Sequence, residues 1–269
     1  TNILKTDSEL ETFPCWTPDG KSVVAAVRVA GAGEPWSTNF DLYQLDPAGK
    51  KAPRNLTVAN PAWDAGPVFS ADGKTLYYRA MKRPGFEADR FGLMAMDVRS
   101  GKTREIAPSW DRSADGIKLS ADGKTLYTAA QDTGEHPLFT VDIVSGQVSK
   151  RVAGGTVGSF DIAGDTLAFT RNTLHSNDQV FTTNAAADAP LRAITPAAGE
   201  HLADVGFGDF EQFSFAGWNG NTVHGYVVKP WNYEEGKQYP VAFLIHGGPQ
   251  GSFGNGWSQR WNAQTYAGQ

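Results

Sequence analysis

One short unit occurs four times in the first two hundred residues, and this repetition constrains the fold more than any other feature. Residues 69–79 read FSADGKTLYYR and residues 119–128 read LSADGKTLYT, while Trp16–Val24 and Ile162–Phe169 are more divergent copies. Each copy is an apolar run, a tight turn and a second apolar run, and three of the turns contain Asp-Gly. Asp-Gly between apolar runs is the strongest short-range indication of a β-hairpin. The unit therefore predicts four hairpins.

A second pair of apolar runs follows each hairpin, joined by a turn such as Asp46–Gly49 or Val144–Gly146. Four strands repeated about every 45–50 residues are typical of β-propeller blades. The sequence predicts four blades of a larger ring, because the first copy begins close to Thr1 without a cap. We interpret Asp19, Asp72 and Asp122 as turn residues rather than metal ligands. The paired runs are Leu42–Leu45 with Arg54–Leu56, Leu93–Met96 with Thr103–Ile106, Leu138–Val141 with Val148–Lys150, and Val180–Thr183 with Leu191–Ile194.

Two long insertions, Arg28–Asn39 and Met81–Arg90, occur at the same step, between the second and third strands of successive blades. Successive connections of an up-and-down blade alternate between its two ends, so both insertions should emerge on one face. Long loops often carry function. The second insertion contains Phe86, Glu87, Asp89 and Arg90, which predicts either a ligand site or a solvated loop with an internal ion pair.

The periodic pattern changes near Val205. Phe210–Gly217 and Thr222–Val228 alternate in polarity and predict a hairpin, whereas Val241–Ile245 is apolar throughout, like a buried strand of a parallel sheet. We therefore predict a partial propeller over residues 1–205 and, over residues 206–269, an open α/β sheet entered by an antiparallel pair, which the His-Gly-Gly motif at its end marks as the N-terminal part of an α/β-hydrolase domain. Three strands cannot bury both faces of such a sheet, so further chain or a partner should cover it.

His246-Gly247-Gly248 follows the apolar run directly. In α/β-hydrolases such a turn presents backbone N–H groups to the oxyanion of a tetrahedral intermediate, and the glycines allow close approach. The alternative is a simple Gly-Gly-Pro turn. No Gly-x-Ser-x-Gly nucleophile motif occurs in the chain, and Ser252 has Gln250 where glycine is required.

Composition narrows the choice of partner. The formal net charge is −5 and no Lys/Arg cluster occurs, which argues against nucleic acid or an anionic membrane as the main partner. Cys15 is the only cysteine, so no intrachain disulfide can form. No apolar run reaches the length of a membrane span, and the first residues do not have the form of a signal peptide, although a removed signal would leave no trace.

The chain resembles the prolyl oligopeptidase family of serine peptidases, in its acylaminoacyl-peptidase and dipeptidyl-peptidase 5 branch. The resemblance is carried by the repeated hairpins and by four segments, of which the last two are the most specific. They are Arg83–Arg90, Gly225–Pro230, His246–Gln250 and Trp257–Asn262. It implies a propeller that caps an α/β-hydrolase domain and a Ser-His-Asp triad located after Gln269, so this chain alone should be inactive. It implies no cofactor and no metal.

The resemblance also assigns candidate roles. Gly248 would supply an oxyanion N–H, with Gly247 as the second choice. A dipeptidyl peptidase needs a carboxylate for the free amine of its substrate, because a buried ammonium without a partner is costly; Glu87 is the first candidate and Asp89 the second. Arg260, expected on a helix after the turn, would brace the site or bind a substrate carbonyl, or pair with a local carboxylate.

Several alternatives remain at this stage. An acylaminoacyl peptidase or an isopeptidase of the same build would act on a blocked amine or a side-chain amide. A non-enzymatic propeller like TolB, whose extension only resembles a hydrolase, is the alternative from another class. The expected partners are peptides, with a homodimer left open, and the resemblance implies a periplasmic or secreted location. The histidines, His246 included, are expected to be structural.

Overall fold

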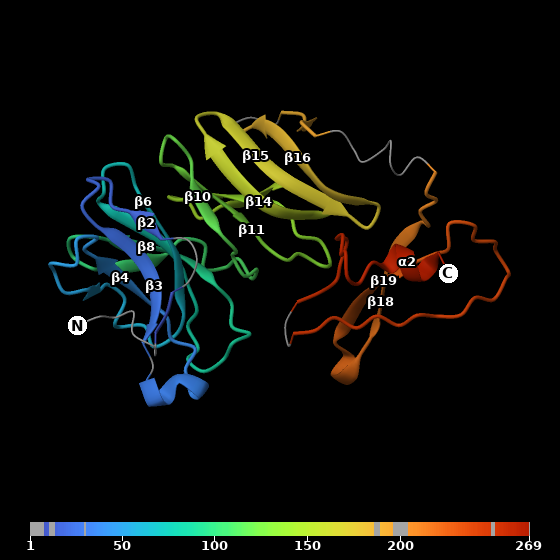
Figure 1. Ribbon diagram of the computed structural model, residues 1–269, viewed down its shortest axis with the longest axis horizontal. Coiled ribbons are helices and arrows are strands. Elements are labelled where there is room, and N and C mark those ends of the chain that lie inside the picture. Colours follow the sequence, from blue (N-terminus) through green and yellow to red (C-terminus); the bar gives the residue numbers. More distant parts are fainter. Residues whose placement is uncertain are drawn as a thin grey trace. The chain divides into compact units, whose positions relative to one another are not determined.

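The computed structural model describes residues 8–10, 14–29, 31–185, 189–195, 204–248 and 251–268 (Figure 1). His201 and the last two residues of the His246–Gln250 motif lie outside these ranges. The chain divides into two compact units, one of Thr1–Ala130 with Phe139–Ser149, the other of Gln131–Leu138 with Lys150–Gln269. This division does not follow the predicted boundary near Val205, which stays a prediction. No helix of the described residues is long and apolar enough to cross a membrane.

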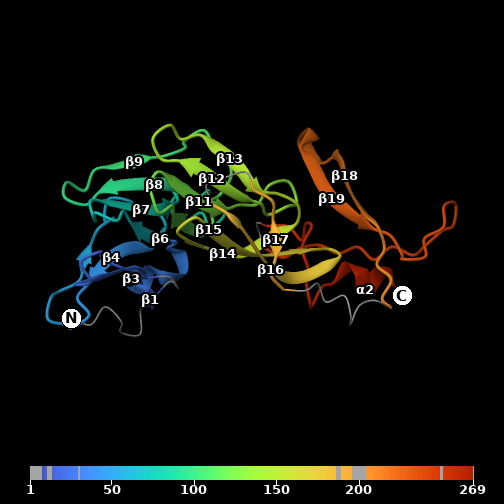
Figure 2. The ribbon, with the colours of Figure 1, turned by 90° about the horizontal axis from the view of Figure 1, so that it is seen from above.

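The four predicted blades are present as four antiparallel sheets, and each repeated unit forms the expected hairpin. In the first sheet β3 pairs with β1, β2 and β4, and β4 pairs with β5. In each of the other three blades every strand pairs with the next one along the chain, as Figure 2 shows for β6 to β9. The first sheet contains β1 (Ser8–Leu10), β2 (Cys15–Trp16), β3 (Val23–Val29), β4 (Asp41–Leu45) and β5 (Arg54–Asn55). The second contains β6 (Asp64–Phe69), β7 (Thr75–Ala80), β8 (Gly92–Asp97) and β9 (Thr103–Glu105). The third contains β10 (Ile117–Leu119), β11 (Thr125–Ala129), β12 (Leu138–Asp142) and β13 (Val148–Val152), and the fourth β14 (Thr156–Ala163), β15 (Thr166–Thr173), β16 (Ser176–Asn184) and β17 (Arg192–Ala193).

The Asp-Gly turns have one geometry in the first three blades. In the second blade Ser70 Oγ donates to Asp72 Oδ1 at 2.7 Å and accepts from the backbone N–H of Thr75 at 2.9 Å. Ser120 and Asp122 repeat both features, and Thr17 donates to Asp19 in the same way. Hydrogen bonds from these hydroxyls are the main reason that the pKa of each aspartate is lowered. The acidic residues therefore act as turn residues, as predicted.

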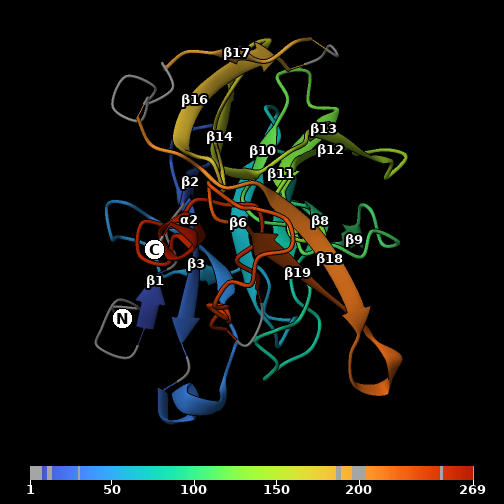
Figure 3. The same ribbon diagram turned by 90° about the vertical axis from the view of Figure 1, so that its right-hand side faces the viewer.

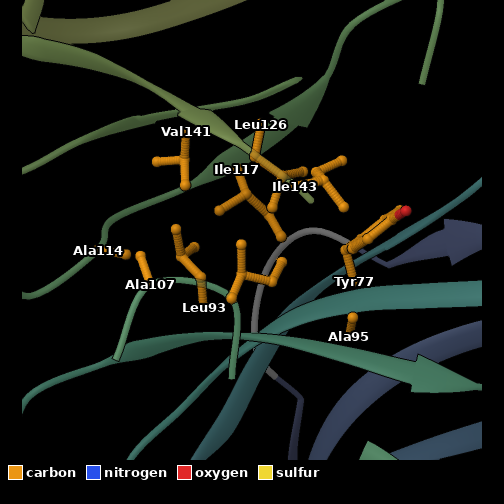
Figure 4. Close-up of a cluster of buried hydrophobic side chains, with 10 residues drawn as sticks. Tyr77, Leu93, Ala95, Ala107, Ala114, Ile117, Leu126, Val141 and Ile143 are labelled. Carbon is orange, nitrogen blue, oxygen red and sulfur yellow. The ribbon is translucent and has the colours of Figure 1, made fainter. Parts of the chain in front are cut away.

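Adjacent blades are held together by apolar side chains. Tyr77 and Leu93 of the second blade pack with Ile117, Leu126 and Val141 of the third (Figure 4). A second cluster joins the first and second blades, and there the ring of Trp63 stacks on Phe40 with centroids 4.6 Å apart. Strand β6 contacts β3 and β4 on one side and β10 on the other, so it links three blades.

The second unit contains the fourth blade and the residues that follow the propeller. The predicted hairpin is formed by β18 (Phe210–Ala216) and β19 (Thr222–Val228), joined through a 3₁₀ turn at Trp218–Gly220 (Figure 3). The only α-helix among the described residues is α2 (Ala263–Ala267).

Two predictions for this region are wrong. Val241–Ile245 forms no strand, because no described segment pairs with it, and Phe243 is 82% exposed. An apolar run forms a buried strand only when a neighbouring strand pairs with it and another layer covers it. Arg260 does not lie on a helix, because α2 starts only after Asn262, whose side chain caps it by accepting from Gln264 N–H at 3.0 Å.

Candidate functional site

The turn His246–Gly248 is exposed. A Cβ placed on Gly247 would meet no atom within 4 Å. The imidazole Nδ1 of His246 lies 2.7 Å from the carbonyl oxygen of Gly247, and the ring meets that of Phe253 edge to face, with centroids 6.4 Å apart. His246 thus contacts both the turn and the segment that follows it, and its structural role stays a prediction.

The segment after the turn is fastened to the fourth blade at Asn255, which is 7% exposed. Its side-chain oxygen accepts from the N–H of Leu174 at 3.1 Å, and its carbonyl oxygen accepts from Thr156 Oγ1 at 3.1 Å. Its own N–H donates to the carbonyl oxygen of Gly134 at 2.6 Å, and its side-chain amide donates to Glu135 Oε1 at 3.3 Å. One buried residue therefore connects three other segments.

Glycines on both sides of Asn255 make this approach possible. A Cβ on Gly254 would collide with the carbonyl oxygen of Gly134, and its φ of +47° lies in the left-handed region. A Cβ on Gly256 would lie 2.9 Å from Thr156 Oγ1. The Gly-Asn-Gly sequence is thus the local requirement for the contact. Sequence reasoning did not identify it, although an Asn between two glycines was a visible signal.

The loop Gln131–Glu135, between the second and third strands of the third blade, is the other half of this contact. Thr133 has a φ of +54°, and its carbonyl oxygen accepts from Gln212 Nε2 of β18 at 2.6 Å. The second carboxylate oxygen of Glu135 accepts from the N–H of Gly154 at 3.0 Å. The loop therefore touches the β18–β19 hairpin, the fourth blade and the segment that holds Asn255.

Arg260 is exposed, and its guanidinium lies 5.2 Å from the ring centre of Trp261. The helix beyond it is anchored by Gln264, whose amide donates to the carbonyl oxygen of Gly208 at 2.9 Å and accepts from the N–H of Gly208 at 2.9 Å. No contact among the described residues gives Arg260 a catalytic role, so its assignment stays a proposal.

The two insertions of the first unit touch each other. The N–H of Gly85 donates to Thr38 Oγ1 at 3.0 Å, and the first insertion carries a 3₁₀ turn at Gly31–Trp36. Their meeting agrees with the expectation that both emerge on one face. Glu87 is exposed within the second insertion.

Asp89 holds the second insertion in shape. Its Oδ2 accepts from the backbone N–H groups of Lys82 and Arg83, each at 2.7 Å. Burial opposes ionisation of Asp89, but these hydrogen bonds outweigh it and lower its pKa. Arg83 in turn lies over the ring of Phe86 at 4.2 Å. Asp89 therefore fixes the loop on which Glu87 is carried. Glu87 and Asp89 belong to the first unit, whereas Gly247, Gly248 and Arg260 belong to the second.

Asp64 was not identified from the sequence. It is fully buried at the start of β6, and its Oδ1 accepts from Asn60 Nδ2 at 2.9 Å while its Oδ2 has no hydrogen-bond partner. Burial raises the pKa of its carboxyl to about 7. The Trp-Asp pair that contains it also occurs at Trp110-Asp111, where the aspartate is exposed and pairs with Arg112, so the motif gave no sign of burial.

No protein-family model matches the chain. Curated relatives do: a probable dipeptidyl-peptidase 5 of Aspergillus clavatus is 37% identical over 94% of this chain and 41% of the relative. Dipeptidyl-peptidase 5 of Arthroderma otae is 33% identical over 94% of this chain and 37% of the relative. The chain thus spans about two fifths of the length of these relatives. Their similarity extends across both the propeller and the residues that follow it.

Among solved structures, an acylaminoacyl peptidase in complex with Z-Gly-Gly-Phe-chloromethyl ketone covers 98% of this chain with a TM-score of 0.73 at 18% identity, and 38% of that structure is matched. TolB from Acinetobacter baumannii covers 72% of this chain with a TM-score of 0.53 at 18% identity, and 45% of it is matched. Fold and turn together define a β-propeller protein that continues into the beginning of an α/β-hydrolase domain. With the relatives above, the chain belongs to the prolyl oligopeptidase family of peptidases.

Proposed function

We propose that the whole protein is a serine exopeptidase that releases N-terminal dipeptides through an acyl-enzyme intermediate. The observation that carries this proposal is the 37% identity to a probable dipeptidyl-peptidase 5 over 94% of the chain. That span includes the repeated blades as well as the His246–Gly248 turn, so a TolB-like binding propeller would leave the similarity after the fourth blade unexplained.

In this mechanism the N–H of Gly248, with Gly247 as the second choice, receives the negative charge that develops on the scissile carbonyl oxygen. A donor held in place before the reaction needs no reorganisation, and losing one typically lowers kcat about 10²- to 10³-fold. The nucleophilic serine, the aspartate and the histidine would lie after Gln269. A serine there would attack the carbonyl, and a histidine would transfer its proton to the leaving amine. No cofactor is needed.

The proposed role of Glu87 is to bind the free α-ammonium group of the substrate. Its loop is held by the two hydrogen bonds to Asp89 and by the stacking of Arg83 on Phe86. Asp89 is the weaker candidate, because one of its carboxylate oxygens already accepts two backbone N–H groups. Arg260 would bind a substrate carbonyl. We extend the proposal to peptides as partners, to a homodimer and to a secreted or periplasmic location.

The test uses the full-length protein and chromogenic dipeptide amides with free and blocked amino termini. We expect hydrolysis of the free-amine substrate and stoichiometric labelling by a fluorophosphonate. Glu87→Gln should raise KM for the free-amine substrate with little change for the blocked one, and Glu235→Gln, an exposed glutamate of the other unit, is the matched control. Preference for the blocked substrate would indicate an acylaminoacyl peptidase, and absence of labelling would support a binding propeller.

A further inference from the structure

We infer that Asn255 is a positioning residue. It fixes the His246–Gly248 turn, which carries the proposed oxyanion donor, to the fourth blade of the propeller. The inference rests on the proposed function and deepens it, because it identifies what holds the proposed oxyanion donor in place. Asn255 touches no substrate in this assignment. Its effect on the reaction is transmitted through Phe253, whose ring meets that of His246.

The connection between the two sites is short. The His246 ring meets Phe253 edge to face across the turn, and Gly254 and Asn255 follow Phe253 directly. The turn itself is exposed, and a Cβ on Gly247 would meet nothing. Among the described residues, the first buried side chain after the turn is that of Asn255, so this residue is the nearest point at which the turn is fixed to a packed element.

The fixation uses every polar group of Asn255. Its backbone N–H and carbonyl oxygen bond to Gly134 and Thr156, and its side-chain oxygen and amide bond to Leu174 and Glu135. A buried polar residue that is satisfied by three separate segments has one low-energy position, because displacement would leave several groups without partners. Trp257 adds a fifth bond, from its N–H to Asn172 Oδ1 at 2.8 Å.

Oxyanion donors act only within a narrow range of positions, and a misplacement of about 1 Å can lower a rate about 10²-fold. Truncation of Asn255 should therefore move the donor rather than remove it. We expect Asn255→Ala in the full-length enzyme to lower kcat about 10- to 100-fold with KM unchanged, and to slow fluorophosphonate labelling equally. Asn232→Ala, at an exposed asparagine of the same unit, is the matched control and should match the wild type.

Two further variants separate positioning from simple loss of stability. Thr156→Val removes the hydroxyl that donates to the carbonyl oxygen of Asn255 and should lower kcat, but by less than Asn255→Ala does. Thr156→Ser keeps the hydroxyl and should have the kcat of the wild type. Asn255→Asp places a second carboxyl beside Glu135, and a proton shared by the pair can replace the lost amide donor. The kcat of the folded variant relative to wild type, measured well below the unfolding midpoint at each pH, should therefore rise as the pH falls.

The outcomes are distinct for the two proposals. If the wild-type protein neither hydrolyses dipeptide amides nor reacts with fluorophosphonate, the proposed peptidase function fails. If the wild type is active and a folded Asn255→Ala or Thr156→Val protein has its full kcat at temperatures well below its unfolding midpoint, the positioning role is wrong. If Asn255→Ala does not fold, the comparison of Thr156→Val with Thr156→Ser decides by the same criterion.

Discussion

Asp64 in the second blade and Ala114 in the third occupy equivalent positions, and both are fully buried. Each lies six residues before the serine of its Asp-Gly turn, Ser70 or Ser120. The backbone N–H of each donates to the residue that precedes the third strand of the neighbouring repeat, Phe40 at 2.8 Å and Phe91 at 3.0 Å. The second blade therefore buries a carboxyl where the third has a methyl group.

This carboxyl should make stability depend on pH. Burial is the main cause of the raised pKa of about 7, hydrogen bonds from Asn60 and Thr57 lower it in part, and the charge of Asp41 raises it further. Between about pH 4 and pH 7 the folded protein holds a proton that the unfolded chain releases, so stability falls as pH rises through this window. The total loss is at most roughly 4 kcal/mol.

Asp64→Asn should remove this dependence, because an amide keeps the volume and the acceptor for Asn60 but cannot ionise. We expect the variant to be more stable than the wild type at pH 8 and to differ little at pH 5, as measured by urea unfolding at several pH values. Tyr78, another titratable group near Asp64, has a pKa raised mainly by burial and stays neutral throughout. Parallel pH curves for the two proteins would contradict the prediction.

The hydroxyl group of the repeated turn should contribute equally to stability in the second and third blades. Ser70→Ala and Ser120→Ala each lose one hydrogen bond to an aspartate and one from a backbone N–H, with the same distances of 2.7 and 2.9 Å. We expect each to lower the free energy of unfolding by about 1 kcal/mol. Ser120→Thr should be tolerated, because Thr17 fills this position in the first blade. Unequal losses in denaturant titrations would mean that the two turns are not equivalent.

The blades could be predicted from the sequence because their determinants are local. An Asp-Gly turn, a hydroxyl residue two positions before the aspartate and alternating apolar residues all lie within about ten residues of each other. The same holds for the β18–β19 hairpin, whose turn contains Asn219 and Gly220. Each of these features is determined by residues of its own segment.

One failed prediction and two features that the sequence did not reveal depend on distant partners. Val241–Ile245 has the composition of a buried strand, but a strand needs a neighbour, and none of the described residues supplies one. The contact between Asn255 and the loop that contains Gly134 joins residues about 120 positions apart, and no periodic pattern records such a meeting. Burial of Asp64 is also set by packing between blades rather than by its own motif.

Gly254→Ala should disrupt the contact around Asn255. Its Cβ would collide with the carbonyl oxygen of Gly134, and its left-handed φ is unfavourable for alanine. We expect faster hydrogen exchange in residues 251–258 and 131–136 and faster cleavage there by a protease. Gly116→Ala is the control, because a Cβ at Gly116 meets no atom within 4 Å. Equal exchange in the two variants would show that the contact does not hold these segments together.

Glu105 should give the opposite pH dependence to Asp64. Its carboxylate, with a side chain 11% exposed, pairs with Lys82 and Arg90 at 2.6 Å each. Burial opposes its ionisation, but the hydrogen bonds from both cations outweigh this and hold its pKa below the ordinary value of 4.5. The stability that this cluster contributes is present above the ordinary pKa and is lost as the pH falls through the lowered one.

Glu105→Gln should therefore destabilise the protein by about 1–3 kcal/mol at pH 7 and by less near pH 3, since a partly buried pair lies between the surface and interior cases. Glu234→Gln breaks an exposed pair with Lys237 and is the matched control, with an expected loss near zero.

Lys82 and Arg90 lie at the two ends of the loop that carries Glu87, so loss of their shared partner Glu105 should also loosen that loop. Under the proposed function, this predicts a higher KM of the full-length protein for free-amine dipeptide substrates, with kcat unchanged. A fall in kcat alone would place the effect of Glu105 outside substrate binding.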